Sequence, residues 1–262
     1  MKFFPANLNV MIKAAQKASK ILIRDFGEIE KLQVSLKGPG DFVTASDKKV
    51  EKILIEELQK ARPDYSILSE EAGEINNKDK ESRWIIDPID GTLNFLHGIP
   101  HFGISIGLEH NGEIIAGIVF DPIKNELFSA AKGKGSYLNN QRIRTSARKN
   151  LKDCIVFTGG PKFNSPNREK IFEEYKKISN FIISPIRKLG SAALDMSYVA
   201  AGRCDAFWQR NLNYWDIAAG VILIKEAGGF VTDFQGMNSY IKNKNILTTN
   251  SKITKEMIKI LN

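Results

Sequence analysis

The spacing of apolar residues predicts two helices at the start of the chain, over residues 8–26 and 46–62. In each segment apolar side chains recur every three or four residues and form one stripe along a helix. Gly27 follows the first stripe and Pro63 follows the second, and both residue types commonly stand where helices end. The opening of the chain is therefore expected to form two amphipathic helices.

Between residues 65 and 138 the pattern changes to short apolar runs separated by turn residues. The turns include His110-Asn111-Gly112 and Asn139-Asn140. Short runs joined by tight turns are typical of an antiparallel meander. The predicted strands span residues 65–68, 84–86, 103–109, 113–121, 126–131 and 136–138.

The rest of the chain alternates between apolar runs and helical stripes. Strands are predicted near residues 154–157, 181–184, 205–208 and 246–249, and helices over residues 168–179, 191–202, 215–227 and 252–261. The fold class is α/β, in the sense of layered helices and sheets: an αβαβα sandwich with an antiparallel N-terminal sheet and a mixed C-terminal sheet. We expect one compact unit over residues 1–262, with sub-layers 1–150 and 151–262 and a change of layer near residues 140–152.

The composition is that of an ordinary globular chain, with 42% hydrophobic and 26% charged residues among 262. The sequence contains no run of about 18 apolar residues, so no membrane span is predicted. Cys154 and Cys204 lie far apart and match no metal or redox motif. Two unpaired thiols favour a reducing, cytoplasmic location.

The net charge of +8 comes almost entirely from residues 140–190, which hold 12 Lys or Arg against 4 Asp or Glu. A basic surface of this kind can bind nucleic acid or attract an anionic substrate. A solvated face is the simpler interpretation, because no zinc-finger spacing and no RNA-binding aromatic pattern accompanies the charge. Nucleic acid is therefore a partner that the sequence allows but does not favour.

The strongest chemical signal is an apolar strand that leads directly into Asp87 and Asp90. Pro88 fixes its own φ and has no N–H, so this turn can direct both carboxylates and the Ile89 carbonyl toward one point. Hard divalent cations such as Mg²⁺ prefer oxygen ligands of this type. Gly91 permits close backbone approach just before the next apolar run, an arrangement that suits a phosphate. A plain turn is the alternative, because Asp-Pro and Asp-Gly are common turn dipeptides.

Two further patterns suggest chemistry less strongly. Gly133-Lys134-Gly135 lies between two predicted strands with no helix after it, so a hairpin turn is expected there rather than a phosphate loop. His97 and His101 are four residues apart, but Pro100 lies between them and no glutamate accompanies them. Both histidines are therefore interpreted as loop residues rather than zinc ligands.

The segment Asp87-Pro88-Ile89-Asp90-Gly91-Thr92 resembles the signature of the inositol monophosphatase family, the Mg²⁺-dependent, lithium-sensitive phosphatases of sugar phosphates. Four other segments resemble the family and occur in the family's order, and together they cover the chain from about residue 40 to residue 235. These are Asp41–Asp47, Ser69-Glu70-Glu71, Gly190–Ala193, and Trp215–Gly220 followed by Glu226–Gly229.

The resemblance implies two Mg²⁺ sites that share one carboxylate. Glu70, Asp87 and the Ile89 carbonyl would bind the first ion, and Asp87, Asp90 and Asp216 would bind the second. A third, weaker ion near Glu70 would help to activate the attacking water. Two metal ions ~3.5–4 Å apart can stabilise both the attacking and the leaving oxygen of an in-line displacement.

Three residues are implied as catalytic: Asp47 and Thr92, a pair that would polarise the attacking water, and Glu70 beside them. Gly91 and Thr92 would donate N–H groups to the phosphate. Taken alone, Asp47 could be only the cap of the helix over 46–62, and Asp216 could cap the helix that it precedes. No serine, cysteine or histidine nucleophile is expected.

The substrate side is implied by Asp90 and by the three residues Gly190, Ser191 and Ala192, which match positions that contact the sugar in the family. Seven residues before Asp216, inositol phosphatases typically carry a glutamate that binds ring hydroxyls, but here that residue is Gln209. Glutamine can still bind hydroxyls, but it lacks the charge and adds a donor. This departure affects the expected preference for inositol and not the hydrolysis.

The expected function is Mg²⁺-dependent hydrolysis of a small phosphate monoester, above all inositol monophosphate, by metal-activated water. One alternative is another substrate of the same superfamily, such as fructose bisphosphate, histidinol phosphate or a nucleotide 3′-phosphate. A second alternative is a binding protein that uses its basic face on RNA or on a protein partner. The resemblance also implies a homodimer, and no membrane partner is expected.

Overall fold

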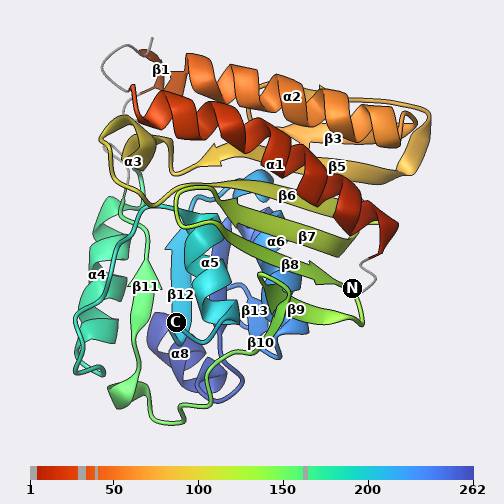
Figure 1. The fold of residues 1–262 in the computed structure, drawn as a ribbon. Helices are drawn as coiled ribbons and strands as arrows, with labels where there is room; N and C mark the ends of the chain where they lie inside the picture. Colours follow the sequence, from red (N-terminus) through yellow and green to blue (C-terminus); the bar gives the residue numbers. More distant parts are fainter. Residues whose placement is uncertain (1–4, 29–33, 39–40, 162–164) are drawn as a thin grey trace.

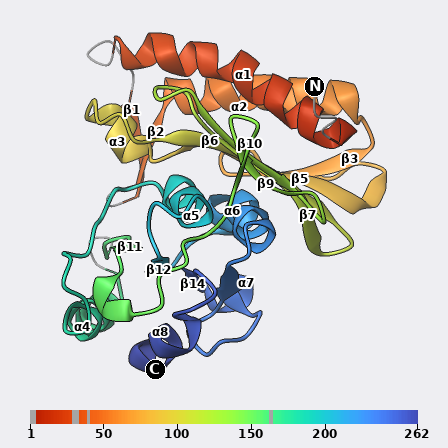
Figure 2. The ribbon, with the colours of Figure 1, turned by 60° about the horizontal axis from the view of Figure 1, so that its bottom comes forward.

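Layers of helices and sheets alternate through the computed structural model, which describes residues 5–28, 34–38, 41–161 and 165–262 (Figure 1). Helices α1 and α2 cover the outer face of a large sheet, and α5 and α6 lie between that sheet and a smaller one (Figure 2). Helices α4 and α8 lie on the outer side of the smaller sheet. The αβαβα arrangement predicted from the sequence is therefore confirmed. The helices named here are α1 (Ala6–Phe26), α2 (Ala45–Ala61), α4 (Arg168–Ser179), α5 (Ala192–Ala200), α6 (Tyr214–Glu226) and α8 (Thr254–Leu261).

The large sheet has eight strands in the order β10-β9-β8-β7-β6-β5-β3-β4. Its strands are β3 (Tyr65–Ser69), β4 (Gly73–Ile75), β5 (Asp79–Asp90), β6 (Gly103–His110), β7 (Glu113–Asp121), β8 (Glu126–Ala131), β9 (Gly135–Leu138) and β10 (Gln141–Ile143). The meander from β5 to β10 is antiparallel as predicted, but β3 pairs with β5 in parallel, so a purely antiparallel sheet was wrong. The parallel pairing arises because β4 runs antiparallel to β3, so the chain is back at the end of the sheet where β3 begins when it enters β5.

The smaller sheet is mixed, as predicted, with the order β11-β12-β14-β13. Its strands are β11 (Val156–Thr158), β12 (Ala206–Arg210), β13 (Phe230–Thr232) and β14 (Asn245–Thr249). The strand predicted near 181–184 does not form. The Ile183 amide instead donates to the Lys152 carbonyl at 3.0 Å, and only Arg187 makes an isolated bridge, to Phe157.

Several short elements carried no clear signal in the sequence. Strands β1 (Val34–Gly38) and β2 (Asp41–Thr44) form a small antiparallel pair, and residues 39–40 between them lie outside the described residues. Helices α3 (Thr92–Leu96) and α7 (Tyr240–Asn243) are short, as is the 3₁₀ helix η2 (Leu151–Asp153). The turn Gly133-Lys134-Gly135 is a hairpin turn as predicted, and its Gly133 and Gly135 amides donate to the Glu226 carboxylate at 2.8 Å each.

The core divides into clusters that follow the layers, because neighbouring side chains on a strand face opposite sides. On β5, Trp84 and Ile86 pack under α1 and α2, whereas Ile85 faces α5 and α6. On β12, Phe207 faces the same inner helices, and Trp208 faces α4 and α8. The inner helices α5 and α6 are thus buried between the two sheets.

Helix α6 lies unusually close to the large sheet at two paired glycines. Gly107 on β6 and Gly117 on β7 are register partners. A Cβ atom at Gly107 would lie 2.9 Å from Ala218 Cβ, and one at Gly117 would lie 2.9 Å from Ala219 Cα. The absence of side chains at these two positions therefore fixes how near the first turns of α6 can approach the sheet.

No helix among the described residues is long and apolar enough to span a membrane. Cys154 and Cys204 are free and buried. Burial raises the pKa of the Cys154 thiol to about 12, so it is an inert packed thiol rather than a reactive one.

Candidate metal and phosphate site

The end of β5 delivers the two central acids. Asp87 and Asp90 are almost fully buried, with 2% and 8% of their surface exposed. The Asp87 carboxylate accepts from the Ile89 amide at 3.0 Å, which closes the tight turn around Pro88. Asp90 is the last residue of β5, and Gly91, at φ +96°, turns the chain into α3. The turn therefore places both carboxylates at the same edge of the large sheet.

The third acid reaches this edge from the second half of the chain. Asp216 lies in the first turn of α6, and carboxylate oxygens of Asp87, Asp90 and Asp216 all lie within 4.8 Å of one another. Its carboxylate also accepts from the Asn213 amide at 2.7 Å, so Asp216 is the third helical residue of a capping box and not the N-cap, which is Asn213. The close packing of α6 on Gly107 and Gly117 sets the distance between α6 and the large sheet, and with it the position of Asp216.

Glu70 follows β3, which pairs in parallel with β5 and so ends at the same edge. Its amide donates to the Ile86 carbonyl at 3.2 Å, one residue before Asp87. The pKa of Asp87 is raised well above its usual value by burial first, and then by the charges of Glu70, Asp90 and Asp216. The structure therefore brings together all four acids that the sequence singled out.

Glu51 on α2 is a supporting residue that the sequence analysis missed. Its buried carboxylate accepts from the amides of Glu71 and Ala72 at 3.0 and 3.1 Å and from the Ser69 hydroxyl. These contacts hold the turn that carries Glu70. The signal was a carboxylate next to Val50, on the inner face of an amphipathic helix where an apolar residue is expected.

The chemistry of this cluster fits a hard divalent cation. Within the described part of the chain no lysine or arginine forms an ion pair with Asp87 or Asp90. Buried carboxylates that lie this close together repel one another strongly. An all-oxygen donor set with this excess of negative charge suits Mg²⁺ better than Zn²⁺, which favours nitrogen and sulfur ligands.

Asp47 and Thr92 meet as predicted, although they are 45 residues apart. The Thr92 hydroxyl lies 3.3 Å from Asp47 Oδ1 and 2.9 Å from the Ile89 carbonyl oxygen. Asp47 also takes part in a capping box, because its Oδ2 accepts from the Thr44 amide at 2.7 Å. Burial raises the pKa of Asp47 to about 6. Asp47 therefore completes the capping box of α2, whose N-cap is Thr44, and is a neighbour of Thr92 at once.

The N-terminus of α5 holds the Asp90 carboxylate. The Ser191 hydroxyl and the Ala193 amide, the latter at 2.8 Å, both donate to Asp90 Oδ2. Burial raises the pKa of Asp90 to about 6, and these two hydrogen bonds oppose that rise. The predicted sugar-contacting residues Gly190, Ser191 and Ala192 therefore lie beside Asp90, and Ser191 is also part of its support.

Close backbone packing joins these loops. A Cβ atom at Gly91 would lie 3.3 Å from the Gly190 carbonyl oxygen and 3.1 Å from that of His101. Asn94, missed by the sequence analysis, donates from its amide to the carbonyls of His101 and Leu189 at 2.7 Å each. The loop after α3 and the loop before α5 are thereby fixed to one another.

Gln209 lies at the end of β12, and it shares a small pocket with Asp216. The other residues around this pocket are Gly160, Ile171, Arg210, Asn211 and Leu212. Arg210 is already engaged: its guanidinium contacts the buried Glu174 carboxylate at 2.6 Å and lies 4.5 Å from the centre of the Phe234 ring. Gln209 is thus a half-buried, uncharged polar residue in a pocket that also contains Asp216.

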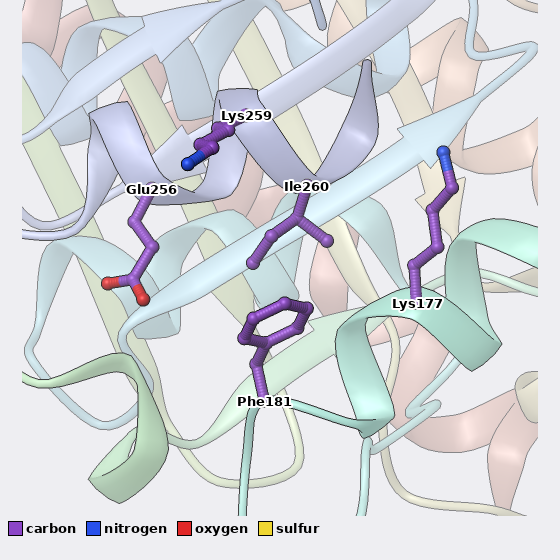
Figure 3. A pocket seen from close by; sticks show the side chains of 5 residues that line it. All are labelled: Lys177, Phe181, Glu256, Lys259 and Ile260. Atoms are coloured by element: carbon purple, nitrogen blue, oxygen red, sulfur yellow. The ribbon is translucent and has the colours of Figure 1, made fainter.

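A second pocket lies between α4 and α8, and α8 is far from α3 in the view of Figure 1. Phe181 and Ile260 face each other across it, with Lys177 and Lys259 at its edge (Figure 3). Among the described residues, Glu256 is the one acidic residue that lines it. This pocket therefore offers an apolar surface rather than groups for hydrolysis.

Comparison with known proteins agrees with this geometry. The model of the inositol monophosphatase family matches residues 7–262. The inositol-1-monophosphatase of Rhizobium meliloti is 49% identical over 256 residues, which cover 98% of this chain and 96% of that protein. The Nus factor SuhB of Escherichia coli K12 is 39% identical over 251 residues, with 96% and 94% covered. The crystal structure of the extragenic suppressor protein suhB from Bartonella henselae superposes with a TM-score of 0.95 at 49% identity and covers 98% of both chains.

Proposed function

The chain belongs to the inositol monophosphatase family, and we propose that its acidic site hydrolyses a small phosphate monoester, most of all inositol monophosphate. The single observation that carries this proposal is the cluster of Asp87, Asp90 and Asp216, with Glu70 beside it and Thr92 across from it. It is a phosphoric monoester hydrolase by family, and the substrate is proposed from the names of its relatives.

Mg²⁺ would be held by Glu70, Asp87, the Ile89 carbonyl, Asp90 and Asp216, in two or three ions per site. When bound, such ions neutralise charge on the phosphate and lower the pKa of a water molecule. The buried carboxylates have the charge and the ligand type for this task. Lithium sensitivity, a property of the family, is proposed with the same site.

Thr92 and Asp47 act on the attacking water in this proposal. The Thr92 hydroxyl donates toward Asp47 Oδ1 and leaves its own lone pairs to accept a hydrogen from water. The amides of Gly91 and Thr92 are proposed to face the phosphate. Water oxygen forms the new bond to phosphorus, the ester P–O bond breaks, and the products are inorganic phosphate and the alcohol, which takes up a proton.

The decisive experiment measures phosphate release from a panel of substrates with Mg²⁺. The panel contains inositol 1-phosphate, fructose 1,6-bisphosphate, histidinol phosphate, a nucleotide 3′-phosphate and glycerol 2-phosphate. We expect release from inositol 1-phosphate to be fastest, and Asp87→Asn to be inactive on every member. Equal release by Asp87→Asn and wild type would contradict the site, whereas a faster alternative substrate would change only the preference.

A second role in binding is favoured by one observation, the similarity to proteins named Nus factor SuhB. The basic segment 140–190 is the surface that we propose for RNA or a protein partner. Part of its charge is already used inside the molecule, since Arg148 pairs with Asp205 and Lys188 lies over the Tyr175 ring. Electrophoretic mobility shifts with a structured RNA, repeated at 50 and 300 mM KCl, would test this role. A homodimer is likewise proposed from the family, and light scattering would measure it.

A further inference from the structure

Two buried polar side chains from distant parts of the chain face each other near Asp90. His101 is 8% exposed and Asp195 is 1% exposed, and His101 Nε2 lies 3.5 Å from Asp195 Oδ1. Within the described residues neither of these two atoms has a hydrogen-bond partner. Burying such groups without a partner costs about 1–3 kcal/mol each, so their meeting in one place calls for a reason.

Asp195 belongs to the same helix turn that holds Asp90. It lies in the first turn of α5, where the Ser191 hydroxyl and the Ala193 amide bind Asp90 Oδ2. Burial is the main cause that raises the pKa of Asp90, and the negative charge of Asp195 on this turn raises it further. A change in the position or charge of Asp195 would therefore be felt at Asp90.

His101 comes from the segment that leads into β6, the strand paired with β5 at Asp90. It lies two residues before Gly103, which is the register partner of Asp90 across β5 and β6. Its carbonyl accepts from the Asn94 amide at 2.7 Å, and its ring meets the Tyr198 ring edge to face at 5.7 Å between centroids. These contacts fix the position of His101 independently of its contact with Asp195.

We propose that His101 and Asp195 are positioning residues whose contact ties the first turn of α5 to the segment before β6 and so holds the Asp90 carboxylate in its working orientation. The pair acts through Asp90 and does not touch the substrate. This inference rests on the proposed function, because it assigns a purpose to the pair only if Asp90 is a metal ligand. Groups that support a metal ligand from behind commonly change metal affinity or activity by about 10–100-fold when they are removed.

The test is a double-mutant cycle with His101→Gln, Asp195→Asn and the double variant. Mg²⁺ affinity is measured by isothermal titration calorimetry without substrate, and kcat and KM are measured separately on inositol 1-phosphate. We expect each single variant to bind Mg²⁺ about 10-fold or more weakly and to lose kcat, with KM changed less. The double variant should be no worse than the worse single one, because both changes break the same contact.

Ser197→Ala is the matched control, since this buried hydroxyl on α5 donates to the Ala193 carbonyl in the same helix. It should leave Mg²⁺ affinity near the wild-type value, whatever its effect on the melting temperature. If Asp195→Asn does not fold, His101→Gln alone still tests the prediction. Unchanged Mg²⁺ affinity in folded variants, or additive losses in the double variant, would overturn the proposal that the contact between His101 and Asp195 positions Asp90. A wild type that binds Mg²⁺ but releases no phosphate would instead contradict the proposed function.

Discussion

The acidic side of the site and the pocket around Gln209 are built in opposite ways. Asp87 and Asp90 are buried and held by backbone amides, a helix end and neighbouring strands. Gln209 is only half-buried and lies near the end of β12. Its pocket also includes Gly160, and residues 162–164, shortly after Gly160, lie outside the described part of the chain. Most substitutions on the acidic side would therefore disturb the whole site, whereas single side chains of the pocket can be substituted without moving the acids.

This contrast separates the reaction from its selectivity. A displacement at phosphorus needs its ligands within a few tenths of an ångström, which rigid strand and helix ends provide. Choice among alcohols depends on a few hydrogen bonds at the rim. We therefore expect changes on the acidic side to affect every substrate equally, and changes in the pocket to redistribute rates among substrates.

Removal of the metal should have the largest effect. Dialysis against EDTA should abolish phosphate release from every substrate, because the acids alone supply no positive charge to the phosphate. Mg²⁺ should restore it, and Ca²⁺ should not, because its looser coordination does not reproduce the compact site. Initial rates from a phosphate assay measure this effect. Undiminished turnover in EDTA would contradict a metal-dependent role for the acidic side.

Asp90→Asn should come next. The amide keeps the shape and can still accept from Ser191 and Ala193, but one ligand charge is lost. The rate should fall at least ~10²-fold, or about 3 kcal/mol, on all substrates alike. The metal-free melting temperature should stay level or rise, because the acids repel one another. Near-normal turnover would remove Asp90 from the site.

Glu174→Gln tests whether the pocket has its own support. Glu174 is buried and pairs with Arg210, so the neutral amide leaves a guanidinium largely uncompensated. A loss of about 3 kcal/mol in the free energy of unfolding is expected, with KM raised more than kcat is lowered. Glu173→Gln, at an exposed position one residue earlier, is the control. A larger effect on kcat than on KM would show that the two sides are not separate.

Gln209→Glu should have the smallest and most selective effect. A carboxylate accepts hydrogen bonds from a polyol and repels a second phosphate. Relative to fructose 1,6-bisphosphate, inositol 1-phosphate should gain about 1–3 kcal/mol in the ratio of kcat/KM values. Glycerol 2-phosphate should be hydrolysed as before. A uniform loss on all three would place Gln209 with the acids instead of the pocket.

Local patterns predicted most helices and most strands, because amphipathic spacing reports directly on which face of an element is buried. The same patterns, with the family resemblance, identified acids that meet across the chain, such as Asp90 and Asp216. They could not show that β3 runs parallel to β5, since pairing direction depends on how the chain returns. His101 was interpreted as an ordinary loop residue, and its contact with Asp195 was missed because the two are 94 positions apart. Asp195 does interrupt the apolar pattern of its helix, but that signal alone names no partner.

Because α6 packs closely on Gly107 and Gly117, the active site depends on two residues that carry no functional group. Asp216 lies at the acids only because Gly107 and Gly117 let its helix approach the sheet. A methyl group at either position would push the helix, and the carboxylate with it. In a library of single substitutions scored for activity, these two positions should therefore be as intolerant as the metal ligands, although neither has a side chain to contribute.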